Sequence, residues 1–137
     1  MSDGIVVDAS VALAWCYPDE TSDFADHVLT RLETTPVVVP ALWSVEIANA
    51  ILAGERRGRL TEAKVSRFFA LLDRLIIEVD PYTSRRAFSA TLPLSRSHQL
   101  SVYDACYLEL AIRRGLELAT LDAQLRLAAE RAGVSLC

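Results

Sequence analysis

Short apolar or β-branched runs alternate along this chain with longer stretches of helical periodicity, and this alternation restricts the possible folds most. Five runs have the length and composition of strands: residues 4–8, 37–39, 76–79, 117–120 and 134–136. Because helical stretches separate most of these runs, the strands are expected to lie parallel. The sequence therefore predicts one α/β domain over residues 1–137. Its expected architecture is three-layer α/β/α around a central, mainly parallel sheet.

Apolar spacing, caps and stop residues predict seven helices: residues 10–17, 22–32, 41–53, 61–72, 83–90, 101–113 and 122–132. Thr61 is the expected cap of the fourth. Pro18 is expected to stop the first helix, the third is expected to end near Gly54, and Pro93 is expected to interrupt the continuation of the fifth.

Three aspartates stand where a parallel sheet places ligand sites or where helices begin. Asp8 and Asp122 come just after predicted strands, and ligands bind beyond the carboxyl ends of such strands. Asp104 follows Ser101 by three residues near the start of a helix. Each aspartate also has a purely structural interpretation as a helix cap or part of a capping box. The residues alone leave both interpretations open.

Glu46 is the most informative acid, because its helix carries so little charge. The polar residues of residues 41–53 are Ser44, Glu46 and Asn49, and the last two lie about 60° apart on one helical face. A solvated face normally carries more charge, so Glu46 is expected to be half-buried. A buried carboxylate needs a cation or a proton, and no basic residue precedes Arg56 in this stretch.

A divalent metal ion is a good candidate for that cation, because Mg²⁺ and Mn²⁺ prefer oxygen ligands. Two such ions about 3.5–4 Å apart could clamp the attacking and leaving oxygens of a phosphodiester. Competing α/β chemistries lack their residues: there is no glycine-rich phosphate loop and no Gly-x-Ser-x-Gly elbow. Ser10 also stands where a dehalogenase-type phosphatase has its second aspartate.

The formal net charge of −4 argues against a basic surface over the whole protein, though not against a local one. Arg56, Arg57 and Arg59 form the best candidate patch for RNA, since arginine binds phosphate well. The structural alternative is a solvated helix end whose cations interact with the helix dipole.

Cysteine usage and hydropathy indicate a cytoplasmic protein. Cys16 and Cys106 lie within apolar helical patterns and are expected to be buried, reduced thiols without a disulfide framework. No apolar run reaches the about 20 residues that span a bilayer, and residues 1–4 lack the basic start of a secretory signal.

Four segments in this order and spacing resemble PIN-domain ribonucleases, and specifically the VapC-like toxins of toxin–antitoxin pairs. They are Val7-Asp8-Ala9-Ser10-Val11-Ala12-Leu13, Pro40-x-x-Trp43-x-x-Glu46-x-Ala48-Asn49-x-Ile51, Leu100-Ser-Val-Tyr-Asp104-Ala-x-Tyr107-Leu-Glu-Leu-Ala111 and Leu118-Ala-Thr120-x-Asp122-x-x-Leu125. Each segment alone is weak evidence, whereas the set covers essentially the whole chain.

The resemblance implies a function and assigns its residues. The family's acidic positions fall on Asp8, Glu46, Asp104 and Asp122, which are expected to be catalytic and to bind Mg²⁺ or Mn²⁺. Its small hydroxyl positions fall on Ser10 and Thr120, which with Asn49 are expected to orient the ligands. RNA cleavage, a homodimer and inhibition by a cognate VapB-like antitoxin are further implications.

Two alternatives to such a toxin remain at this stage. One is a PIN-type nuclease that acts in RNA processing or on DNA outside a toxin–antitoxin pair. The other is a non-catalytic module that binds metal and works only by pairing with a partner, with the four acids serving as caps and as structural ligands.

Overall fold

Four parallel strands form the sheet in this computed structural model, which describes residues 4–17 and 22–137. The strands are β1 (Ile5–Val7), β2 (Val37–Val39), β3 (Ile77–Val79) and β4 (Glu117–Ala119), arranged in the order β3-β2-β1-β4. All three strand pairs are parallel. The predicted parallel α/β architecture is therefore confirmed.

The fifth predicted strand, residues 134–136, is reduced to one parallel bridge between Leu118 and Leu136. The Leu118 N–H donates to the Ser135 carbonyl oxygen at 2.9 Å, and the Cys137 N–H donates to the Leu118 oxygen at 3.0 Å. Only one residue of β4 exchanges hydrogen bonds with this segment, so the ladder is too short to count as a strand.

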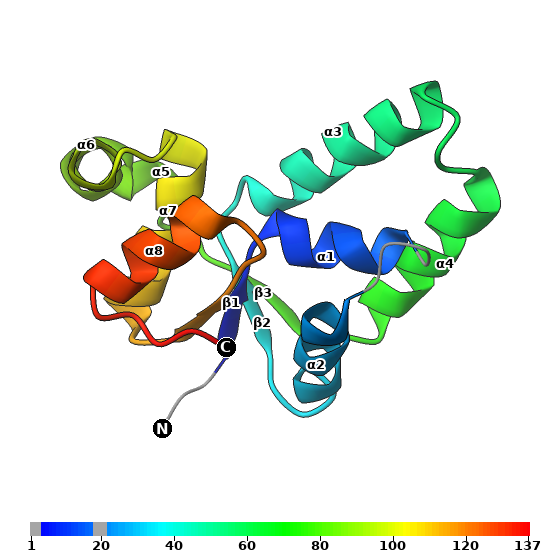
Figure 1. Cartoon of the computed structure of the whole chain (residues 1–137), viewed down its shortest axis with the longest axis horizontal. Coiled ribbons are helices and arrows are strands. Elements are labelled where there is room, and N and C mark those ends of the chain that lie inside the picture. The colour runs from blue at the N-terminus through cyan, green and yellow to red at the C-terminus, as the bar shows by residue number, and fades with distance from the viewer. Residues whose placement is uncertain (1–3, 18–21) are drawn as a thin grey trace.

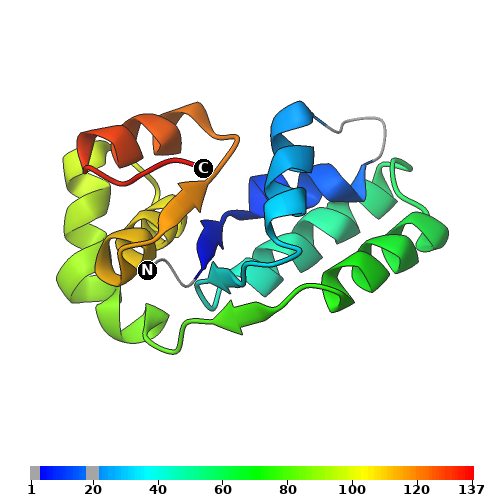
Figure 2. The same ribbon diagram turned by 90° about the horizontal axis from the view of Figure 1, so that it is seen from below.

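Helices cover both sides of the sheet (Figure 1). On one side lie α1 (Ala9–Cys16), α2 (Asp23–Arg31), α3 (Trp43–Arg56) and α4 (Glu62–Asp73), with α1 contacting the other three. On the other lie α5 (Thr83–Arg86), the π-helical segment η2 (Ala87–Thr91), α6 (Leu92–His98), α7 (Val102–Arg114) and α8 (Ala123–Arg131). The same division is visible in the turned view of Figure 2.

The helix α3 ends near Gly54, as predicted, but it continues to Arg56 and so includes the glycine. Gly54 is buried where α3 meets the α3–α4 turn, and a Cβ atom there would lie only 2.8 Å from Leu60 Cδ1. The glycine thus serves a close approach of chain segments rather than a left-handed cap. Pro18, the expected stop of the first helix, lies outside the described residues.

Pro93 does not interrupt the helical stretch after β3. The helix α5 runs on through η2 into α6, and Pro93 is the second residue of α6. Across the π-helical turn the Leu92 N–H donates to the Ala87 oxygen. A proline in the first turn of a helix costs little, because the N–H groups there have no partner within the helix.

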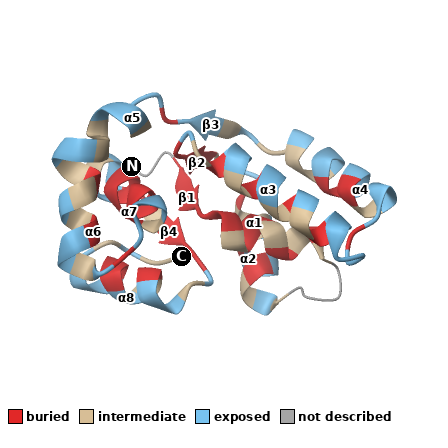
Figure 3. Ribbon diagram, turned by 90° about the horizontal axis from the view of Figure 1, so that it is seen from above, coloured by how far each residue is buried: buried red, intermediate tan, exposed pale blue. Residues whose placement is uncertain are grey.

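The core lies on both faces of the central strands, and Figure 3 shows β1 and the inner turns of the helices as buried. Ile5, Val6 and Val7 have no exposed surface, as expected of a parallel strand covered on both faces. Cys16 and Cys106 are buried free thiols, as predicted. Among the described residues no helix has the length and hydropathy needed to cross a membrane.

Candidate active site

Asp8 occupies the carboxyl end of the central strand and is fixed there by the start of α1. Its Oδ1 accepts hydrogen bonds from the backbone N–H groups of Ser10, at 3.0 Å, and Val11, at 3.3 Å. Asp8 is therefore the N-cap of α1, which confirms the structural interpretation of this residue. It is also only 4% exposed, so a carboxylate stands at the buried edge of the sheet.

Two hydroxyl groups tie Asp8 to the loop between β4 and α8. The Ser10 hydroxyl donates to Asp8 Oδ1 and the Thr120 hydroxyl donates to Oδ2, each at 2.5 Å. The two hydroxyl oxygens also accept hydrogen bonds from the backbone of the loop. The Ser10 hydroxyl accepts from the Leu121 N–H at 3.1 Å, and the Thr120 hydroxyl accepts from the Asp122 N–H at 3.0 Å. Strand register explains this meeting, because Val7 pairs with Ala119 and so brings Asp8 beside Thr120.

Glu46 lies in the first turn of α3 and is half-buried, as its uncharged surroundings predicted. Its Oε1 accepts a hydrogen bond from the hydroxyl of Tyr107, a residue of α7 that is 1% exposed. The Glu46 carboxylate therefore points from α3 toward α7, which lies on the opposite side of the sheet edge. Asn49, one turn further along α3, is exposed.

Asp104 and Asp122 both sit at helix starts on the other side of the edge. The Asp104 N–H donates to the Ser101 hydroxyl at 3.1 Å, whereas the Asp122 carboxylate caps α8 by accepting from the Leu125 N–H at 2.9 Å. Both are half-buried. The capping geometry orders the backbone, while the charge of each carboxylate acts on its neighbours.

The carboxylates interact as like charges. Burial is the largest cause that raises the pKa of Asp8, Glu46 and Asp104 above its ordinary value. Asp104 further raises the pKa of both Asp8 and Glu46, and Asp122 raises that of Asp104. Hydrogen bonds from Ser10, Thr120 and Tyr107 work in the opposite direction, and the causes include no positive side chain.

This set of donors fits a hard divalent cation in its chemistry. It consists of oxygen atoms alone, and its negative charge lacks a counter-charge among the groups that shift its pKa values. Within residues 4–17 and 22–137, however, no three His, Cys, Asp or Glu side chains are placed to hold one ion together. The arrangement matches binding through one or two carboxylates with water completing the shell, which is the usual mode for Mg²⁺.

The pH dependence of stability offers a test of this crowding. Raised pKa values in the folded state mean that these acids stabilise the fold below their unfolded pKa values, about 4, and that this contribution is lost as pH rises through the raised values. In EDTA, Asp104→Asn should therefore gain in melting temperature relative to the wild type as pH rises from about 4 to 7.

Thermal unfolding followed by circular dichroism measures that difference directly. Glu117 changes in the opposite sense, because Arg31 lowers its pKa, but it is common to both chains and cancels. Asp73→Asn, exposed at the end of α4, controls for loss of one negative charge. A gap between the wild type and Asp104→Asn that stays constant with pH would contradict the crowding.

Comparison with known proteins places these features in a family. The model of the PIN domain family matches residues 5–131. The chain belongs to the PIN domain family. This confirms the resemblance that the four sequence segments indicated.

Curated relatives of this PIN domain include Ribonuclease VapC3 of Pyrobaculum aerophilum, which is 31% identical over 88% of this chain and 91% of its own length. Ribonuclease VapC3 of Mycobacterium tuberculosis is 33% identical over 88% of this chain and 84% of its own. Among solved structures, PAE2754 from Pyrobaculum aerophilum has a TM-score of 0.66 at 26% identity, covering 91% of this chain and 78% of that one. FitAcB from Neisseria gonorrhoeae, with a TM-score of 0.60 at 17% identity over 96% and 95% of the two chains, shares the fold.

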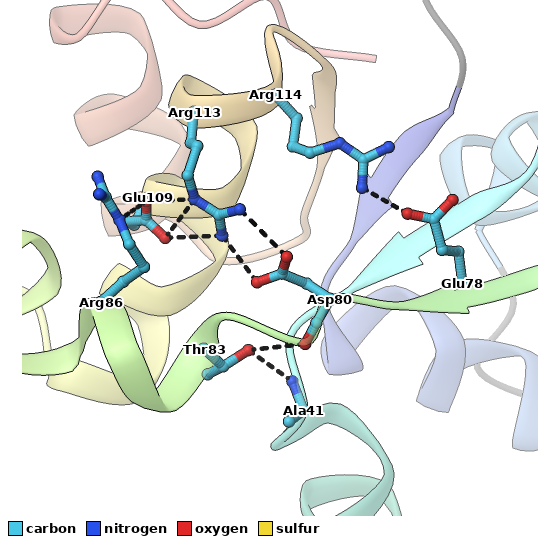
Figure 4. A network of polar contacts seen from close by, with 8 residues as sticks. All are labelled: Ala41, Glu78, Asp80, Thr83, Arg86, Glu109, Arg113 and Arg114. Atoms are coloured by element: carbon cyan, nitrogen blue, oxygen red, sulfur yellow. Dashed lines mark hydrogen bonds and ion pairs between the residues drawn. The ribbon is translucent and has the colours of Figure 1, made fainter.

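Sequence reasoning about this PIN domain missed an ion network with two buried carboxylates, which Figure 4 shows. Arg113 of α7 binds Asp80 through both terminal nitrogens, at 3.1 and 2.7 Å, and also binds Glu109 at 2.9 Å. Arg86 binds the same Glu109 at 3.2 Å. The Asp80 and Glu109 side chains are only 2% and 5% exposed, so Arg113 joins two buried carboxylates, one just after β3 and one on α7.

A signal for Asp80 was present in the sequence. Asp80 directly follows a predicted strand, as Asp8 does, and Glu109 and Arg113 are four residues apart on one helix. The network also reaches the start of the α3 segment, because the Thr83 hydroxyl donates to the Asp80 carbonyl and accepts from the Ala41 N–H at 2.9 Å. It therefore helps to set the position of α3 relative to α7.

Proposed function

We propose that this PIN domain is a Mg²⁺- or Mn²⁺-dependent endoribonuclease and the toxin of a VapBC-type toxin–antitoxin pair. Relatives named Ribonuclease VapC3 support the nuclease activity. The observation that carries the proposal is the meeting of Asp8, just after β1, with Glu46 of α3 and Asp104 of α7, where the charge of Asp104 raises the pKa of the other two acids. A cluster of repelling carboxylates costs stability unless a cation binds there.

In the proposed site Asp8, Glu46, Asp104 and Asp122 hold the ion directly or through water. The bound cation would supply positive charge beside a scissile phosphodiester and promote ionisation of the attacking water. Ser10 and Thr120 fix both oxygens of Asp8 by hydrogen bonds, which orients the carboxylate for its role. Asn49, on the exposed face of α3 one turn further along, is proposed to help orient the metal ligands.

The direct test is a cleavage assay on RNA and on the matching DNA with Mg²⁺, with Mn²⁺ and with EDTA. The proposal expects cleavage of RNA that either metal supports and EDTA abolishes. Preferred cleavage of DNA would favour the alternative of a PIN-type nuclease with another substrate. Metal binding without cleavage of either strand type would favour a non-catalytic partner module.

Arg56, Arg57 and Arg59 are proposed to guide RNA toward the acidic edge. All three are exposed at the end of α3 and in the following turn, with the Arg59 guanidinium 4.7 Å from the centre of the Tyr17 ring. Arg56→Glu combined with Arg57→Glu should weaken RNA binding. It should also make the slope of log binding constant against log salt concentration shallower by about 0.7 per lost phosphate contact. Fluorescence anisotropy with a catalytically blocked chain at several salt concentrations measures both quantities.

A charge-matched control separates this patch from a general loss of positive charge. Arg74→Glu combined with Arg131→Glu changes the net charge equally at two other exposed positions. The control should keep more of the binding and of its salt slope. Equal losses in both double variants would contradict a local RNA-binding patch.

A VapB-like antitoxin and a second copy of this chain are the proposed partners, and the cytoplasm is the proposed location. The four-segment resemblance motivates the partners, and exposed apolar side chains on α3 and α4 offer a protein surface. Val45, Leu52 and Phe69 are 69%, 42% and 50% exposed. A short open reading frame directly upstream, whose product copurifies with this chain and inhibits cleavage, would support the antitoxin.

A further inference from the structure

Tyr107 is a buried tyrosine whose hydroxyl joins α7 to α3 at the acidic edge. It donates a hydrogen bond to Glu46 of α3, and the backbone N–H of Ala9, the first residue of α1, lies near enough to lower the pKa of the hydroxyl slightly. Tyr107 itself lies on α7, one turn after Asp104. A buried hydroxyl is stable only when hydrogen-bonded, and this one donates to the Glu46 carboxylate.

Glu46 depends on this contact for its orientation. Within the described part of the chain, the Tyr107 hydroxyl is the only hydrogen-bond partner of the Glu46 side chain. The contact occupies Oε1 and leaves Oε2 without a protein partner there. Because the ring of Tyr107 is packed in the core, its position is fixed, and the hydroxyl gives Glu46 a fixed reference on α7, one turn from Asp104.

We propose that Tyr107 is a positioning residue that, through its hydroxyl, holds Glu46 toward Asp8 and Asp104 for binding a divalent cation. This inference rests on the proposed function of the four acids. Tyr107 itself has no role as a ligand, since its hydroxyl donates to the Glu46 carboxylate. Partners that orient metal ligands typically change metal affinity by 10–100-fold when removed.

The test is Mn²⁺ binding to the full chain, followed by the electron paramagnetic resonance signal of free Mn²⁺. Tyr107→Phe keeps the ring and removes one oxygen, and is expected to weaken binding about tenfold or more. Tyr103→Phe is the matched control on the same helix, because its side chain is 66% exposed, and it should bind like the wild type. Melting temperatures check that each variant is folded.

A double-mutant cycle distinguishes positioning from a merely structural role. If Tyr107 acts through Glu46, Tyr107→Phe should change Mn²⁺ affinity by less than about twofold in a Glu46→Ala background.

If Tyr107→Phe does not fold, a chain with 3-fluorotyrosine at position 107 takes its place, because this residue keeps both the ring and the hydroxyl. Its more acidic hydroxyl should shift Mn²⁺ affinity, whereas the same label at position 103 should not.

Each result has a definite meaning. Wild-type affinity in Tyr107→Phe, an equal loss in the Glu46→Ala background, or no shift from 3-fluorotyrosine at position 107 overturns the positioning role and leaves the metal site intact. No Mn²⁺ binding by the wild type overturns the proposed function, and the positioning role with it.

Discussion

Asp8→Asn is expected to lower metal-dependent RNA cleavage by about a thousandfold while leaving the fold intact. The estimate follows because charge stabilisation by a metal ion contributes several kcal/mol to catalysis and about 1.4 kcal/mol corresponds to a factor of ten. Asparagine is as good an N-cap as aspartate, so its Oδ1 can still accept the N–H groups of Ser10 and Val11. The amide also keeps the shape of the carboxylate beside Thr120.

Single-turnover cleavage of RNA under saturating Mn²⁺, with melting temperature as the check on folding, measures this effect. Asp23→Asn is the matched control, because Asp23 is an exposed acid in the first turn of α2. The control should cleave at the wild-type rate. Full activity in a folded Asp8→Asn chain would remove Asp8 from the catalytic machinery.

Arg113→Met should destabilise the fold by about 3–5 kcal/mol, because it leaves two buried carboxylates without their shared partner. Asp80 and Glu109 lose their contacts with Arg113 together, and only Glu109 retains a second arginine, Arg86. Methionine keeps much of the apolar length of the arginine side chain, so the loss reports on charge more than on packing. Urea unfolding gives the free energy directly.

Arg114→Met provides the comparison from the next residue of the same helix. Arg114 pairs with Glu78 at 2.5 Å, but the two side chains are 30% and 49% exposed. An exposed pair of this kind typically contributes less than about 1 kcal/mol. Similar free energies of unfolding for the two variants would show that the buried network adds no more stability than a surface ion pair.

Short strands and helix caps could be predicted from the sequence, because each depends on a few neighbouring residues. The β-branched run at 37–39 and the caps at Thr61 and Ser101 lie where the sequence placed them. Differences arose where tertiary packing overrode a local signal. Gly54 lies inside α3, where its lack of a side chain permits the close approach of the following turn. At Pro93 the helical stretch continues past the proline through a π-helical turn.

The candidate site divides in the same way. Asp8 and Asp122 were identifiable because each follows a strand, and Glu46 because its helix is otherwise almost uncharged. The contact between Glu46 and Tyr107 joins residues 61 positions apart, and the one between Arg113 and Asp80 joins residues 33 apart. No periodicity encodes such pairs, since they depend on how α3, α7 and β3 pack together.

The central claim is that carboxylates from separate segments hold a divalent ion at the carboxyl edge of the sheet. Diffraction from crystals soaked in Mn²⁺, recorded for its anomalous signal, tests that claim most directly. The account predicts an anomalous peak beside Asp8 and Asp104, and its loss in crystals of Asp8→Asn. Fully ordered carboxylates with no peak among them at saturating Mn²⁺, or a peak bound only elsewhere, would contradict it.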